Sequence, residues 1–182
     1  MKRNLKETWE LAYCNGIKCI KQILKVTVDS KSRDFQFKIL HNILYTNEKL
    51  YKLNPVKFPT NLCSFCHAVS ETIEHLFYNC KHTIGIWEPI ITVWGKALKL
   101  RAVPSKICLI LSDPDETLLL NFISLIVRKY IYYCKRKESL PVFRELYNQF
   151  KLLYKYEHFI AKKNHKLIPF LKKWTPLIPY VS

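Results

Sequence analysis

Glycine is scarce in this chain of 182 residues, which has three glycines against nine prolines. So few glycines exclude a fold made of many short strands joined by glycine turns. Apolar residues recur instead mainly at three- and four-residue intervals, the spacing of amphipathic helices. The sequence therefore predicts a mainly α fold.

A long uninterrupted apolar run is also missing. The longest strongly apolar stretch, residues 117–127, is shorter than the about 18 residues that a membrane span needs, and two basic residues close it. The basic start of the chain is not followed by the apolar run of a signal peptide, because Lys6, Glu7 and Glu10 interrupt it. We therefore predict an intracellular protein, in the nucleus or the cytoplasm, with no membrane partner.

Acidic residues are few: 14 Asp and Glu face 30 Lys and Arg, which leaves a formal charge of +16. Such an imbalance attracts polyanions and says nothing about the fold. We therefore predict RNA, DNA or both as partners. No small-molecule substrate is expected.

Cysteines are present in an odd number, seven, and no secretion signal accompanies them. This combination argues against a disulfide framework and favours a reducing compartment. Four metal-binding residue types follow the spacing Cys63-x2-Cys66-x8-His75-x4-Cys80. Two thiolates two residues apart can hold one tetrahedral ion from a tight turn, and a histidine and cysteine near one helical turn apart can complete it.

Three sulfurs and one imidazole fill the four positions of a Zn²⁺ ion, so the quartet predicts one structural zinc and no catalytic metal. His67 and His82 are the alternatives if one of the four ligands is misassigned. The remaining cysteines have no matching histidine nearby and are read as small apolar residues within helices: Cys14, Cys19, Cys108 and Cys134. The full expectation is a small zinc knuckle embedded in a helical bundle, with a long basic helical hairpin in the C-terminal half.

Periodicity and capping residues outline the helices and leave residues 101–112 open. Trp87 and Trp94 share one stripe and are expected in the core. A second apolar stripe, broken only by Glu157, predicts an amphipathic core helix; it consists of Phe143, Leu146, Phe150, Leu153 and Ile160. In the first half of the chain the predicted helices are two short ones within 5–26, then 34–44, 46–53, a short one from the cap Ser70 toward Cys80, and 84–98, where Pro89 either kinks the helix or starts a new turn. In the second half they are one from Asp113 to about 137, one from 139 to about 163, and a short helix in the tail before an extended end.

Basic residues in the C-terminal half form the candidate nucleic-acid surface, because their contacts with phosphates are salt-sensitive and largely independent of sequence. The candidates are Arg128, Lys129, Lys135, Arg136, Lys137, Arg144, Lys151, Lys155, Lys162 and Lys163. Tyr130, Tyr132 and Tyr133 could stack on unpaired bases, although for each of them taken singly a core position is favoured.

The motif Glu-Thr-x-Glu-His-Leu-Phe at 71–77, between flanking cysteines, resembles the zinc-binding family that follows the polymerase domain of reverse transcriptases in LINE-type, non-LTR retrotransposons. The resemblance covers about residues 35–95. It is also carried by Phe35–Leu44, Thr46, Leu50, Cys63–Cys66, Asn79, Cys80 and Trp87.

The resemblance implies that the zinc ligands are Cys63, Cys66, His75 and Cys80. It also implies an accessory module that helps the polymerase domain of the same element hold RNA or DNA during target-primed reverse transcription. Three parts follow: 1–31 as a helical lead-in, 32–100 as the zinc-binding domain and 101–182 as a basic helical C-terminal domain. We expect this chain to be the last part of a longer reading frame.

Two other functions are considered, an enzyme and a protein-docking module. No Tyr/Phe-x-Asp-Asp pair is present to hold catalytic magnesium, and Pro114-Asp115, which superficially suggests a nuclease signature, reads better as a helix start. We therefore predict that the chain is not an enzyme. The other alternative is a protein-docking module that packs on the polymerase through the knuckle and the Trp87/Trp94 face.

Overall fold

The computed structural model describes residues 25–27, 29–98 and 118–181. These residues are largely helical and form no strand, apart from an isolated antiparallel bridge between Leu62 and Ser70, which confirms the mainly α prediction. In chain order the elements are α3 (Ser30–Leu40), α4 (Asn47–Leu53), the π-turn η1 (His75–Asn79), α5 (Lys81–Pro89), the π-turn η2 (Ile90–Trp94), α6 (Gly95–Ala97), α8 (Leu118–Arg136), α9 (Phe143–Lys163), α10 (Leu167–Trp174), the 3₁₀ turn η3 (Thr175–Leu177) and α11 (Ile178–Val181).

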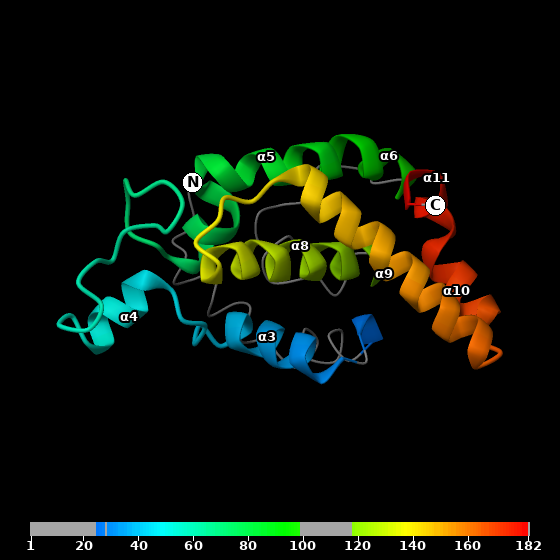
Figure 1. Cartoon of the computed structure of the whole chain (residues 1–182), viewed down its shortest axis with the longest axis horizontal. Helices are drawn as coiled ribbons and strands as arrows, with labels where there is room; N and C mark the ends of the chain where they lie inside the picture. The colour runs from blue at the N-terminus through cyan, green and yellow to red at the C-terminus, as the bar shows by residue number, and fades with distance from the viewer. Residues whose placement is uncertain (1–24, 28, 99–117, 182) are drawn as a thin grey trace, which may run out of the picture.

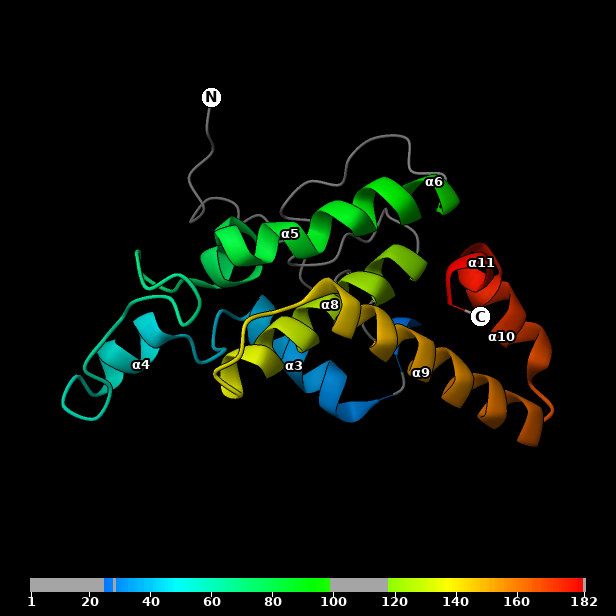
Figure 2. The same ribbon diagram turned by 45° about the horizontal axis from the view of Figure 1, so that its top comes forward.

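Helix α8 is the central element. It lies between α3 on one side and the rod formed by α5, η2 and α6 on the other (Figure 1 and Figure 2). Every side chain from Leu120 to Leu125 is buried, so the first turns of α8 are covered all round. Aromatic packing joins the layers, because the ring of Phe35 on α3 lies 5.6 Å from that of Tyr132 on α8 and 6.2 Å from that of Phe77 in η1.

The rod above α8 contains both predicted core tryptophans. Proline cannot donate a helical hydrogen bond, and the chain widens into the π-turn η2 directly after Pro89. Trp87 and Trp94 are each 2% exposed, which confirms them as core residues. The Trp87 indole donates to the carbonyl of Phe77 at 2.6 Å, and the Trp94 ring packs edge-on against Phe150 of α9 at 4.7 Å.

Helix α9 carries the predicted apolar stripe and docks α10. Leu146 and Phe150 are fully buried. Glu157, the polar position within that stripe, accepts hydrogen bonds from the Trp174 indole at 2.7 Å and from the Lys173 ammonium at 2.9 Å. The carboxylate is therefore the anchor of α10 on α9.

The end of the chain differs from its prediction. The tail continues as η3 and α11, with Leu177 and Val181 fully buried, where we expected an extended end. The Tyr147 hydroxyl donates to the carbonyl of Tyr180. Burial of these apolar side chains against α9 outweighs the turn propensity of the prolines in the tail.

The predicted helices over 46–53, 84–98 and 139–163 are confirmed, with ends that shift by a few residues. The short helices within 5–26, the segment 101–112 and the start at Asp113 lie outside the described residues. The division at 31/32 and 100/101 stays a prediction. No helix in the described part of the chain is both long and apolar enough to cross a membrane.

Candidate functional site

Cys63, Cys66, His75 and Cys80 converge on one point. Their ligand atoms all lie within 4.8 Å of one another. The sulfurs of Cys63 and Cys80 are 3.9 Å apart, and the Cys66 sulfur is 3.3 Å from the His75 Nε2. Ligand atoms around one tetrahedral zinc are separated by about 3.5–3.8 Å, given the usual bond lengths. The quartet therefore fits a zinc ion in donor chemistry, and its donor atoms lie close enough together to surround one ion.

A tight turn presents the first two ligands. The amide of His67 donates to the carbonyl of Cys63 at 3.0 Å, and that of Phe65 donates to the Cys63 sulfur at 3.4 Å. His67 closes the turn with a positive φ of 52° and an exposed side chain. Neither His67 nor His82 is in the cluster of donor atoms, so the structure offers no support for the alternative ligand assignments.

The π-turn η1 presents the other two ligands. Five residues of α-helix would place side chains about 140° apart around the axis. Here the Cys80 amide bonds the His75 carbonyl at 2.9 Å, five residues back, so the wider turn brings both side chains to the same side. The helical turn that leads into η1 begins at Ile73, and Thr72 caps it, because its hydroxyl accepts from the His75 amide at 3.0 Å. The prediction of Ser70 as cap is wrong.

Burial sets the protonation of the metal-free site. It raises the pKa of the Cys63 thiol to about 12 and also raises the pKa of Cys80. At Cys66 burial acts in the same direction, but hydrogen bonds from backbone amides, beginning with that of Ala68, and from the neighbouring thiols outweigh it and lower the pKa. Burial lowers the pKa of His75, which keeps the imidazole neutral. A metal ion must therefore displace a proton from each of the two buried thiols.

Glu71, four residues before His75, ties the knuckle to the bundle. Its fully buried carboxylate accepts from the Asn47 amide at 2.9 Å and from the Ser64 amide and hydroxyl at 2.7 and 2.6 Å. It also forms an ion pair with Lys135 of α8 at 2.6 Å, and that lysine is only 10% exposed. In the sequence, Glu71 was noted only as part of the family motif. The feature that could have singled it out is an acidic residue next to the metal ligands of a strongly basic chain.

The other cysteine within the described residues, Cys134, is buried and outside the cluster, as predicted for a small apolar residue. Burial raises the pKa of its thiol. Cys14, Cys19 and Cys108 lie in the parts of the chain that the structure leaves undescribed.

Six of the ten candidate nucleic-acid contacts are exposed side chains at the end of α8, just after it, and along α9. They are Arg136, Lys137, Arg144, Lys155, Lys162 and Lys163. Lys129 and Lys151 are half-buried: Lys129 pairs with Asp29 at 3.2 Å, and the Lys151 ammonium lies 5.1 Å from the centre of the Tyr147 ring.

The other two candidates are buried and require correction. Arg128 has no exposed surface, because α8 is covered on both sides at this position. Lys135 is held by Glu71 and has little exposure. Neither side chain can reach a phosphate on the surface of this structure, although both belong to the basic sequence that motivated the prediction.

The three candidate stacking tyrosines differ in their exposure to solvent. Tyr130 is 2% exposed, and its hydroxyl bonds the backbone of Val142 in the α8–α9 connection. Tyr132 is half-buried and donates to the carbonyl of Tyr45 at 3.2 Å. Tyr133 is 53% exposed, with the Lys137 ammonium 6.0 Å from the centre of its ring, so it alone of the three presents a largely exposed ring to solvent.

Comparison with known families agrees with the geometry. Residues 4–87, which contain the whole quartet, match the family described as zinc-binding in reverse transcriptase. No curated protein and no solved structure matches the chain. The converging ligands and the family match together identify this part of the chain as a zinc-binding domain of the reverse-transcriptase type.

Proposed function

We propose that the chain is a non-catalytic, zinc-stabilised accessory module of a LINE-type, non-LTR reverse transcriptase. In this role it binds RNA or DNA through the basic surface of α9 and supports target-primed reverse transcription by the polymerase domain of the same element. Three thiolates and one imidazole would hold the zinc and leave no open position for water, so the ion would stabilise the fold without activating a substrate. Function then depends on the surface that the zinc-bound knuckle helps to position.

The observation that carries this proposal is the row of exposed cations on α9. Arg144, Lys155, Lys162 and Lys163 are exposed, and no carboxylate of the described residues forms an ion pair with any of them. Four cations that each neutralise a phosphate of a single strand give a slope of about −3 for log affinity against log salt. The affinity should then fall by about 50-fold between 50 and 200 mM salt.

The test is to measure binding of a fluorescent single-stranded RNA or DNA at several salt concentrations. The triple variant Lys155→Gln/Lys162→Gln/Lys163→Gln should lower the steepness of the salt dependence by about 2. A matched control, Lys57→Gln/Lys81→Gln/Lys96→Gln, removes three exposed lysines from other elements and should leave the slope unchanged. Equal effects of the two variants would show that the α9 row has no particular role.

A protein-docking module is the second candidate, with a different surface from the one first expected. Trp87 and Trp94 are core residues and cannot form a docking face. Helix α4 instead has no buried residue and extends away from the bundle (Figure 1). Leu53, its last residue, is 67% exposed, and Val56 just after it is 93% exposed. Co-sedimentation with the polymerase domain of the same element, lost in Leu53→Ser/Val56→Ser, would favour this function.

A further inference from the structure

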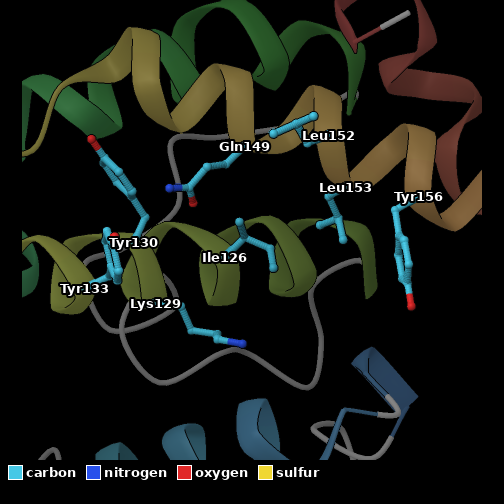
Figure 3. Close-up of a pocket in the computed structure, with 8 residues that line it drawn as sticks. All are labelled: Ile126, Lys129, Tyr130, Tyr133, Gln149, Leu152, Leu153 and Tyr156. Carbon is cyan, nitrogen blue, oxygen red and sulfur yellow. The ribbon is translucent and has the colours of Figure 1, made fainter.

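Three surface hollows along α8 adjoin one another through shared lining residues. The hollow between α8 and α9 has a volume of about 540 Å³ (Figure 3), and those on either side have about 500 and 820 Å³. Lys129 lines all three. Tyr133 joins the first to the second, and Tyr156 joins the first to the third. We name these three adjoining hollows together the α8 trough.

The walls of the α8 trough carry exposed aromatic rings from three different elements. Tyr133 on α8 is 53% exposed, Tyr156 on α9 is 65% exposed and Tyr45, after α3, is 58% exposed. Figure 3 shows Tyr133 and Tyr156 at opposite ends of the central hollow, with Ile126 and Leu153 between them. Aromatic rings that line an apolar floor and remain open to solvent suit flat, partly apolar ligands.

The charged residues of the trough leave a cationic excess. Three of its lysines are matched by three carboxylates, in the ion pairs Lys38–Asp34, Lys129–Asp29 and Lys173–Glu157. Lys25, Arg136 and Lys166 also line it, and no ion pair with a described residue involves them. Arg136 belongs to one outer hollow, and Lys25 and Lys166 belong to the other, so the excess charge lies toward both ends.

The geometry points to the α8 trough as a binding site for single-stranded nucleic acid, an inference that rests on the proposed function. Bases stack on Tyr133 and Tyr156, while the phosphates that follow contact Arg136 at one end and Lys166 at the other. Along α8 the trough extends from Phe122 to Arg136, about 21 Å at 1.5 Å per residue. A duplex keeps its bases paired and stacked, so it offers only phosphates to these rings and gains nothing from the aromatic walls.

This site differs from the α9 cation row in the ligand form that it selects. The cation row attracts any polyanion, because contacts with phosphates carry no preference for base or strand number. The trough adds a stacking contribution that only unpaired bases receive. The two surfaces can therefore be separated by experiment.

The test uses the full zinc-loaded chain and fluorescein-labelled 12-nucleotide single strands, with a duplex of the same length for comparison. Tyr133→Ala/Tyr156→Ala should weaken single-strand binding by about 30-fold or more, as expected for the loss of two stacked bases. The slope against salt should stay as in the wild type, since phenol rings displace no counterions. Tyr133→Phe/Tyr156→Phe keeps both rings and should bind as the wild type does.

The matched control is Tyr51→Ala/Phe159→Ala, which removes two rings that are 40% and 64% exposed and that do not line the trough. This control should retain wild-type affinity. If the wild type binds no oligonucleotide at low salt, the proposed function and the trough both fail. If it binds single strands but Tyr133→Ala/Tyr156→Ala binds equally well, or if the duplex binds more tightly, the trough alone is overturned.

Discussion

Replacing Glu71 with glutamine should destabilise the zinc-loaded protein strongly. The carboxylate is fully buried and accepts from Asn47, Ser64 and Lys135 at 2.6 to 2.9 Å. Glu71→Gln keeps the volume of the side chain but leaves the Lys135 ammonium, 10% exposed, without its counter-charge. Removing one partner of a buried ion pair costs about 3–5 kcal/mol. This is a large part of the about 5–15 kcal/mol by which a typical domain is stable.

The assay is urea unfolding of the zinc-loaded protein, followed by far-ultraviolet circular dichroism. Glu48→Gln is the matched control, because it removes the same charge from the exposed pair of Glu48 and Lys52 and should cost about 0.5 kcal/mol or less. Glu71→Gln/Lys135→Met should recover part of the loss, since the uncompensated charge is then gone. A loss for Glu71→Gln no larger than that of the control would refute the role assigned to this pair.

Two further predictions concern the metal and the C-terminal helices. Zinc affinity should rise steeply with pH between 6 and 8, by about 100-fold per pH unit or more, because burial raises the pKa of Cys63 to about 12 and also raises that of Cys80, so at least these two thiols give up a proton on binding. Competition with a colorimetric chelator measures this, and a flat profile would contradict it. Glu157→Gln should weaken the packing of α10 on α9 by about 1–3 kcal/mol, because the hydrogen bonds from Trp174 and Lys173 lose their charged acceptor. Amide hydrogen exchange should become faster in α10 and α11 while the amides of α3 stay protected. Unchanged exchange in α10 and α11 would argue against this role of Glu157.

The sequence was most informative where chemistry and periodicity were both local. The spacing of the quartet predicted a cluster that the structure brings within 4.8 Å, and the apolar stripe of α9 predicted the buried Leu146 and Phe150. The two tryptophans seven residues apart were correctly assigned to the core. In each case the pattern lies within one short segment of the chain.

Other features depend on neighbours distant in the chain, which a local pattern does not contain. Arg128 reads as a surface cation beside Lys129, but α8 is covered on two sides and buries it. Lys135 reads the same way, but Glu71 lies 64 residues away in the sequence and pairs with it. The α8 trough has the same origin, since Tyr133 and Tyr156 belong to different helices.

Zinc content, measured together with the effect of chelation on folding, tests the central claim most directly. A structural zinc contributes about 10 kcal/mol or more to the folding of small zinc modules. Purified protein should therefore contain one zinc per chain. Chelation should remove the ion and, with it, the protection of the backbone amides of residues 61–80 from hydrogen exchange. A chain that binds no zinc at micromolar concentrations, or that unfolds at the same urea concentration with and without chelator, would contradict the assignment of Cys63, Cys66, His75 and Cys80 as a structural metal site.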